Sequence, residues 1–115
     1  MLYTVAPTNA GGGTEVSGGS YARPGLASNT TNLSGTQSAG STSASSGSGG
    51  RTSNNVAVTY PAPTADWGDV VAAGRKDAST AGNLLFWKLF ASPKTISAGG
   101  SAPNYAPNTL GIQLL

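Results

Sequence analysis

The chain has 115 residues, with no histidine, no cysteine, six basic residues and four acidic ones. General acid–base catalysis needs a positioned titratable group, and metal sites need clustered His, Cys or carboxylate ligands. The sequence therefore predicts no enzyme and no catalytic, cofactor-binding or metal-binding residues. The net charge of +2 is unclustered, which predicts no nucleic-acid partner. Because no apolar run approaches the ~18 residues of a membrane span, we also expect no membrane partner.

The composition predicts a chain that is only marginally stable alone. It contains 17 glycines and seven prolines, and few large apolar side chains. Burial stabilises a fold by about 25 cal/mol per Å² of apolar surface, whereas ordering the backbone costs about 1–2 kcal/mol per residue. Small scaffolds compensate with disulfides, metals or oligomerisation. With the first two absent from the sequence, we expect this chain to oligomerise or to dock on a partner.

In chain order, the first expected element is an N-terminal β segment over residues 1–27. It has a short strand at Leu2–Ala6 and then an extended region, Thr14–Ser17 and Ser20–Leu26, interrupted by two glycines. Residues 28–55 are rich in Gly, Ser and Thr, a composition typical of a flexible arm or long loop.

Residues 56–115 are predicted to form the main β-domain. Val56–Tyr60 alternates with period two, as a half-buried strand does. Ala98–Asn108 is expected to be a loop. Four further strands are predicted at Asp69–Gly74, Asn83–Phe90, Lys94–Ser97 and Thr109–Leu114. Short strands separated by turn signals predict one all-β domain, a small antiparallel sandwich or barrel with a long Gly/Ser-rich arm.

Two motifs have a chemical interpretation and a structural one. The glycines at 11–13 and 18–19 suggest a phosphate loop, but no helix and no Lys-Ser/Thr pair follows them, which favours structural turns. Asp66 and Asp69 are three residues apart beside Trp67 and Gly68. No further acid joins them, so turn-forming aspartates are favoured over a carboxylate pair or a calcium site.

Five aromatic side chains could form a sugar-stacking platform, but most of them lie in apolar strand context. We expect them to pack in the core or at a subunit interface, and we expect Trp87 to be buried. They are Tyr60, Trp67, Phe86, Trp87 and Phe90.

The blocks outside the Ser/Gly arm resemble a family of small virion proteins of tailed bacteriophages, often labelled tail fibre proteins. The glycine-rich block Gly11–Arg23 carries the resemblance, together with Ser53–Pro61, Thr64–Gly68, Asp77–Trp87 and Lys94–Ile96. The chain departs from the family pattern in a shortened start, in Arg75-Lys76 where an apolar pair is usual, and in an irregular end. If the segment missing from the start is a strand, the chain either has an open strand edge or borrows a strand from a neighbour, and an open edge invites pairing with another chain.

The resemblance implies a virion structural protein made in the host cytoplasm. The first expectation is a capsid decoration (cement) protein, a homotrimer on the outer head surface that binds the major capsid protein and neighbouring copies of itself. The alternative is a tail-fibre or baseplate component involved in receptor binding. A carbohydrate-binding module outside the virion, and more distantly a hydrolase, are the other classes considered.

Overall fold

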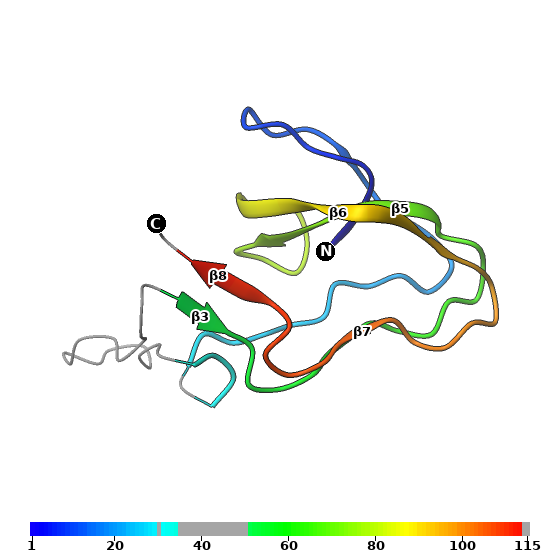
Figure 1. Cartoon of the computed structure of the whole chain (residues 1–115). Helices are drawn as coiled ribbons and strands as arrows, with labels where there is room; N and C mark the ends of the chain where they lie inside the picture. Colours follow the sequence, from blue (N-terminus) through cyan, green and yellow to red (C-terminus); the bar gives the residue numbers. More distant parts are fainter. Residues whose placement is uncertain (30, 35–50, 114–115) are drawn as a thin grey trace. The chain divides into compact units, whose positions relative to one another are not determined.

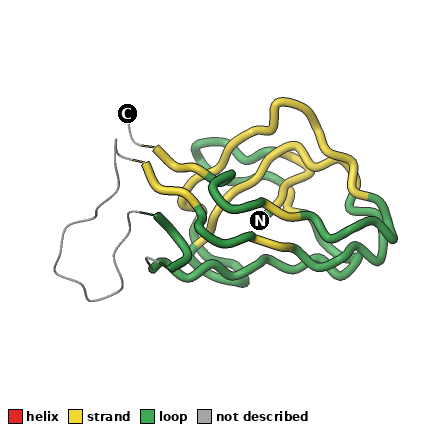
Figure 2. Tube along the Cα trace, turned by 60° about the horizontal axis from the view of Figure 1, so that its bottom comes forward, coloured by secondary structure: helices red, strands yellow, loops and turns green. Residues whose placement is uncertain are grey.

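The structure is a computed structural model that describes residues 1–29, 31–34 and 51–113. Within these ranges it consists of strands and loops (Figures 1 and 2), and no helix there is long and apolar enough to span a membrane. The all-β class predicted from the sequence is confirmed. The described residues form eight strands, namely β1 (Leu2–Val5), β2 (Thr14–Glu15), β3 (Arg51–Ser53), β4 (Val58–Thr59), β5 (Gly68–Lys76), β6 (Leu84–Ile96), β7 (Asn104–Tyr105) and β8 (Gly111–Gln113).

These described strands form three antiparallel sheets. The largest has the order β2-β1-β5-β6, and β3–β8 and β4–β7 are two-stranded ladders. In the described part of the chain the four-stranded sheet has β2 and β6 as its edges. The sheet therefore does not close on itself, and the barrel included in the sequence prediction is wrong.

The chain divides into two compact units. The first unit consists of Met1–Pro24 and Tyr60–Pro103, and the second of Gly25–Thr59 and Asn104–Leu115. The four-stranded sheet belongs to the first unit, and both small ladders belong to the second. Residues 35–50, the centre of the expected arm, lie outside the described residues.

The core of the first unit forms where β1 pairs with β5. Tyr3 lies opposite Ala72 in the register, and both are buried in one cluster with Met1. Small residues on β5 make room for the tyrosine ring, because a Cβ at Gly74 would lie 3.0 Å from the Cε2 atom of Tyr3. Trp87 packs against this cluster and is half-buried within the single chain, less than the full burial expected from the sequence.

A second part of this core is an aromatic cluster of Tyr21, Tyr60 and Trp67. The Trp67 ring meets Tyr21 edge-on with centroids 5.2 Å apart, and Tyr21 stacks on Tyr60 at 6.0 Å. The Trp67 indole N–H donates to the carbonyl oxygen of Gly19 at 2.9 Å. Tyr60 and Trp67 are buried, which satisfies the expectation that they pack in the core.

The second unit is built around Asn54, a polar side chain with no exposed surface. Its Nδ2 donates to the carbonyl oxygens of Val56 at 2.9 Å and Ala106 at 2.8 Å. Its Oδ1 accepts from the backbone N–H of Leu110 at 2.8 Å. Because a buried polar group is costly unless it is hydrogen-bonded, these bonds fix how the segments around 54 and 106–110 meet.

Several predicted strands differ from the observed ones for local reasons. The strands expected at Asn83–Phe90 and Lys94–Ser97 are one strand, β6. The register passes from the Leu89–Ala72 pair to the Lys94–Val70 pair, so Pro93 falls in an irregular stretch between them. A proline is tolerated there because no ladder hydrogen bond needs its missing N–H.

Other elements are shorter than expected or lie where a loop was predicted. The alternating run Val56–Tyr60 supplies only the two-residue β4, and no strand forms over Ser20–Leu26. Conversely, β3 falls inside the predicted arm and β7 inside the loop expected at Ala98–Asn108. These short polar strands are held by partners distant in the chain, β8 and β4 respectively.

Candidate functional site: the edge of strand β6

The strongest candidate for a functional surface is the edge strand β6. Among the described residues β6 pairs only with β5, so its other edge is open (Figure 1). Three large apolar side chains near its start are exposed: Leu85 by 55%, Leu89 by 54% and Phe86 by 40%. An open strand edge with exposed apolar side chains is a template for pairing with another chain.

These apolar residues lie on both faces of the sheet. Leu89 is opposite Ala72, which is also opposite the buried Tyr3, so Leu89 shares the face of the core cluster. Phe86 is opposite Arg75, and its position three residues before Leu89 puts it on the other face because strand side chains alternate. Apolar exposure on both faces at one edge suits a partner that extends the sheet.

Two irregularities limit the regular part of this edge. The pairing of β6 with β5 is continuous from Phe86–Arg75 to Leu89–Ala72, and the register shifts on either side of that stretch. Bulges bend a strand and interrupt its ladder. Residues 86–89 therefore form the uninterrupted ladder that includes the exposed Phe86 and Leu89, whereas the exposed Leu85 lies in the irregular position before it.

A hollow of about 660 Å³ opens beside the start of β6. Its walls are the turn at residues 8–11 and residues 83–87. Thr8 and Asn9 contribute polar groups, Phe86 and Trp87 contribute rings, and no lining side chain is charged. The hollow thus has room for uncharged side chains of a partner next to the exposed edge.

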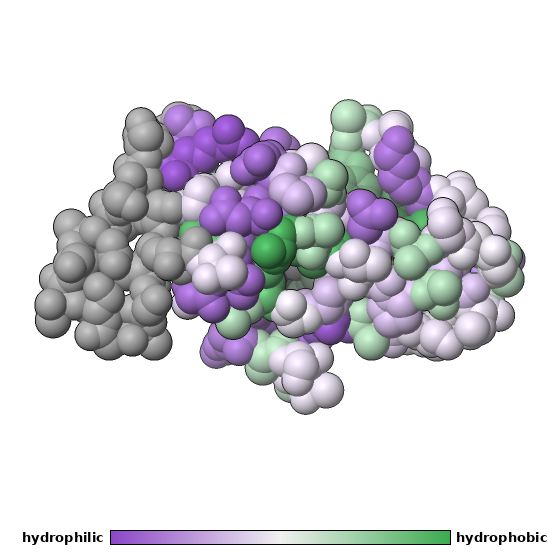
Figure 3. Space-filling model, turned by 90° about the horizontal axis from the view of Figure 1, so that it is seen from below, coloured by the Kyte–Doolittle hydropathy of each residue, from purple (hydrophilic) through white to green (hydrophobic). Residues whose placement is uncertain are grey.

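Elsewhere the apolar surface is dispersed. In the view of Figure 3, most of the described surface is coloured hydrophilic or near neutral, and strongly hydrophobic colour is confined to small areas. Val5, on β1, is the remaining large apolar side chain with high exposure among the described residues.

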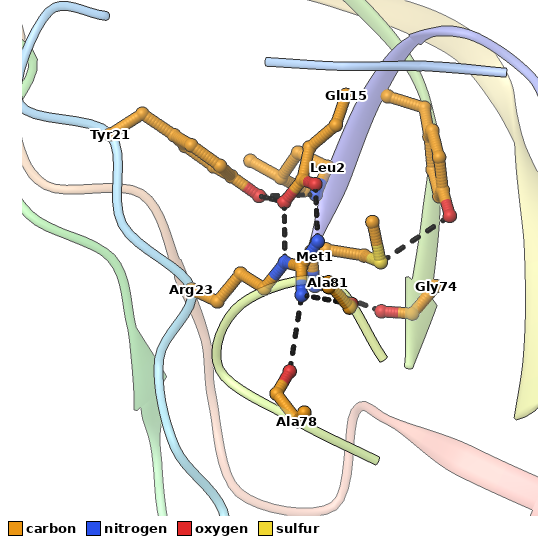
Figure 4. Close-up of polar contacts among 9 residues, drawn as sticks. Met1, Leu2, Glu15, Tyr21, Arg23, Gly74, Ala78 and Ala81 are labelled. Atoms are coloured by element: carbon orange, nitrogen blue, oxygen red, sulfur yellow. Dashed lines mark hydrogen bonds and ion pairs between the residues drawn. The ribbon is translucent and has the colours of Figure 1, made fainter. Parts of the chain in front are cut away.

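The end of the sheet opposite β6 is fixed by an ion pair between β2 and the segment after it. Arg23 donates from Nε to Glu15 Oε1 at 2.7 Å and from Nη2 to Oε2 at 2.6 Å, a two-pronged geometry (Figure 4). Its Nη1 also donates to the carbonyl oxygens of Ala78 at 3.1 Å and Ala81 at 2.9 Å. Arg23 thereby connects β2 to the loop between β5 and β6.

The same network determines the protonation of its members. Burial alone would raise the pKa of Glu15, but the hydrogen bonds from Arg23 and Tyr21 and the positive charge of Arg23 hold that pKa below its usual value. The Met1 amino group donates to the Gly74 carbonyl at 2.8 Å. Its burial lowers its pKa from 8.0 to about 6, although Glu15 acts in the opposite direction.

Residues of the two motifs with a chemical interpretation make hydrogen bonds within the fold. Gly19 sits in a turn and accepts the Trp67 indole N–H through its carbonyl oxygen. Asp66 accepts the backbone N–H of Ala98 at 2.7 Å, and Asp69 accepts the hydroxyl of Thr95. No group of three or more potential metal ligands occurs in the ranges the structure describes.

The structure separates the five aromatic residues considered for a platform. Tyr60 and Trp67 are buried with Tyr21, a partner that the sequence analysis missed, whereas Phe86, Trp87 and Phe90 lie on β6. The exposure of Leu85 and Leu89 was also missed. The one feature of the sequence that points to these two leucines is that they belong to an unusually apolar run, which follows the last long hairpin loop.

The comparison with protein families agrees with the resemblance noted in the sequence. The family model described as podophage GP4 fiber I protein gp80 matches residues 1–113. The chain belongs to this family. It is thus a structural protein of a bacteriophage virion, of tail-fibre type. No curated protein and no solved structure matches the chain.

Proposed function

We propose that the protein is a fibre component of the podophage tail that joins its neighbours through the open edge of β6. The observation that carries the proposal is the family match over residues 1–113, because the family is named for a fibre protein. That name favours the tail-fibre alternative over the capsid-decoration role that was the first expectation from the sequence.

The architecture of the first unit supports a role in assembly. Its sheet ends in a 13-residue edge strand whose exposed residues include Leu85, Phe86 and Leu89. Exposed apolar side chains that gather along one strand edge are typical of an interaction site, whereas single ones are common on any surface. In a virion, such an edge would be covered by an adjoining subunit, which would also supply the stabilisation that a glycine-rich chain lacks.

The copy number of the protein in purified virions tests the location. Quantitative mass spectrometry against the major capsid protein and the portal protein gives the ratio directly. A tail fibre component is expected at a copy number comparable to that of the portal and far below that of the capsid protein. A copy number close to that of the capsid protein would contradict the fibre role and support capsid decoration.

A further inference from the structure

We infer that the hollow beside the start of β6 is a binding site for a neutral saccharide. Its two walls, the turn at residues 8–11 and residues 83–87, both belong to the first unit. Its volume of about 660 Å³ falls within the range of small-ligand sites, about 300–1,000 Å³. The inference goes beyond the proposed function. It is tested on the isolated protein, whereas location is tested on virions, so each can fail without the other.

The turn that forms one wall is held in shape by its own hydrogen bonds. The backbone N–H groups of Thr8 and Gly11 each donate to the carbonyl oxygen of the other residue at 2.9 Å. The Thr8 hydroxyl also accepts the backbone N–H of Ala10 at 3.2 Å. Within the described residues the side-chain amide of Asn9 has no hydrogen-bond partner. An ordered turn therefore presents one amide donor and acceptor, and binding need not pay to order it.

The opposite wall carries a second amide that is fixed in orientation. The Asp77 carboxylate accepts the backbone N–H of Asn83 at 2.7 Å and its side-chain Nδ2 at 2.9 Å. These two bonds lower the pKa of Asp77 below its ordinary value, so the carboxylate stays ionised at neutral pH. Because Nδ2 is held by Asp77, the Asn83 Oδ1 is left as an acceptor, and it has no partner in the part of the chain that the structure describes.

Aromatic rings complete the lining. Phe86 is 40% exposed and Trp87 is half-buried, and both contribute to the hollow. A sugar ring has C–H groups on its faces, which pack on aromatic rings, and hydroxyls at its rim, which donate to and accept from amides. The combination of rings with uncharged amides is therefore complementary to a saccharide.

The lining disfavours other classes of ligand. No side chain that lines the hollow is charged, so a phosphate or carboxylate would lose water there without gaining an opposite charge. An acyl chain would cover the amides of Asn9 and Asn83 without pairing them, which is costly. A neutral saccharide is the class that uses both the rings and the amides.

An array of immobilised oligosaccharides tests the ligand class. The array carries neutral oligosaccharides of hexoses, deoxyhexoses and N-acetylhexosamines beside sialylated and sulfated ones. Fluorescent tetramers of the full chain are applied, because multivalency makes a weak single site detectable. We expect binding to neutral oligosaccharides and none that requires an acidic group. Titration of the best neutral oligosaccharide into the monomeric chain, followed by NMR, should give a dissociation constant on the order of 1 mM.

Four variants test the place of binding. Asn9→Ala removes an amide donor and acceptor and should weaken binding about three- to tenfold. Phe86→Ala removes the exposed ring and should weaken it by a similar factor. The matched controls are Asn104→Ala, at an exposed asparagine on β7, and Val5→Ala, at a 57% exposed side chain on β1. Both controls should bind as the wild type does.

Three results would overturn the inference. One is the absence of binding to any neutral oligosaccharide on the array, the result expected if the hollow only receives side chains of a neighbouring subunit. Another is binding to acidic oligosaccharides alone. The last is equal affinity of Asn9→Ala and Asn104→Ala, both shown to be folded by circular dichroism.

Discussion

Asn54 is the residue on which the second unit depends most. Its amide makes three hydrogen bonds to the backbone of Val56, Ala106 and Leu110 in a buried site. Asn54→Ala would leave these three backbone groups unpaired and should lower the free energy of unfolding by about 2–4 kcal/mol. Urea denaturation measures this loss. The neighbouring exposed Asn55 is the control, and an equal effect of Asn55→Ala would contradict the assignment.

Position 19 requires glycine for two reasons, the local backbone conformation and the close approach of neighbouring atoms. Its φ is +54°, and a Cβ there would lie 2.8 Å from the Ala65 carbonyl oxygen and 2.9 Å from the Trp67 indole nitrogen. Gly19→Ala should therefore destabilise the fold by about 2 kcal/mol or more and change the fluorescence of the buried Trp67.

Gly25→Ala serves as the comparison for this change. Gly25 has an ordinary φ, and a Cβ added there would have nothing within 4 Å, so its substitution should leave the melting temperature nearly unchanged. If Gly19→Ala and Gly25→Ala have the same melting temperature, the close approach at Gly19 does not contribute to stability.

The Met1 amino group gives the stability of this polypeptide a specific pH dependence. The chain has no histidine, so the α-amino group is the group that ordinarily titrates between pH 6 and 8. Its pKa is about 6 in the folded protein and 8.0 ordinarily. The unfolded chain therefore binds more protons in this window, and the free energy of unfolding should rise with pH by about 2 kcal/mol between pH 6 and 8.

Chemical denaturation at a series of pH values checks the sign. Glu15 does not contribute to this slope, because its lowered pKa gives a stabilisation that is already complete above its ordinary pKa and is lost only in acid. A stability that is flat or falls between pH 6 and 8 would show that the amino group is not buried as described.

At the scale of elements, Arg23 joins strand β2 to the β5–β6 hairpin. It pairs with Glu15 through two nitrogens and donates to Ala78 and Ala81 in the hairpin loop. Arg23→Lys keeps the charge but cannot make the two-pronged contact and the loop contacts together. It should cost about 1–3 kcal/mol in the free energy of unfolding.

The exposed Lys94 supplies the control for this arginine variant, because Lys94→Arg changes one basic residue for the other away from the network. It should leave stability within about 0.5 kcal/mol of the wild type. Equal melting temperatures for wild type and Arg23→Lys would mean that a positive charge at this position is enough for stability, without the two-pronged contact and the loop contacts.

The sequence predicted the elements whose signal is local. Leu2–Ala6 and Asp69–Gly74 have β-branched and apolar residues between turn signals, and strands β1 and β5 form there. The polar strands β3 and β7 could not be found, because Arg51–Ser53 and Asn104–Tyr105 are held by ladders to distant segments. The composition of a short segment does not indicate which distant segment it pairs with.

The candidate site was predictable only in part. The apolar run at Asn83–Phe90 predicted a strand, and the expectation of a core or subunit interface included Phe86 and Trp87. Which side chains are covered depends on strand order, since β6 is exposed because it lies at the edge of the sheet. The residues of a single strand do not indicate the order β2-β1-β5-β6. The exposure of Leu85 and Leu89 was therefore missed.

At the scale of the whole molecule, two units of different construction share one chain. The first has an apolar and aromatic core with an open sheet edge, and the second is organised by a buried asparagine. Membership of the fibre protein family gives this architecture its context. A fibre subunit must join other subunits at fixed positions, and the open edge of β6 is where we expect it to do so.

Electron microscopy of virions labelled with an antibody against this protein locates it on the particle. A fibre component should give label at the tail, at a few sites on each particle, with heads free of label. Label distributed over the head surface would contradict the fibre role.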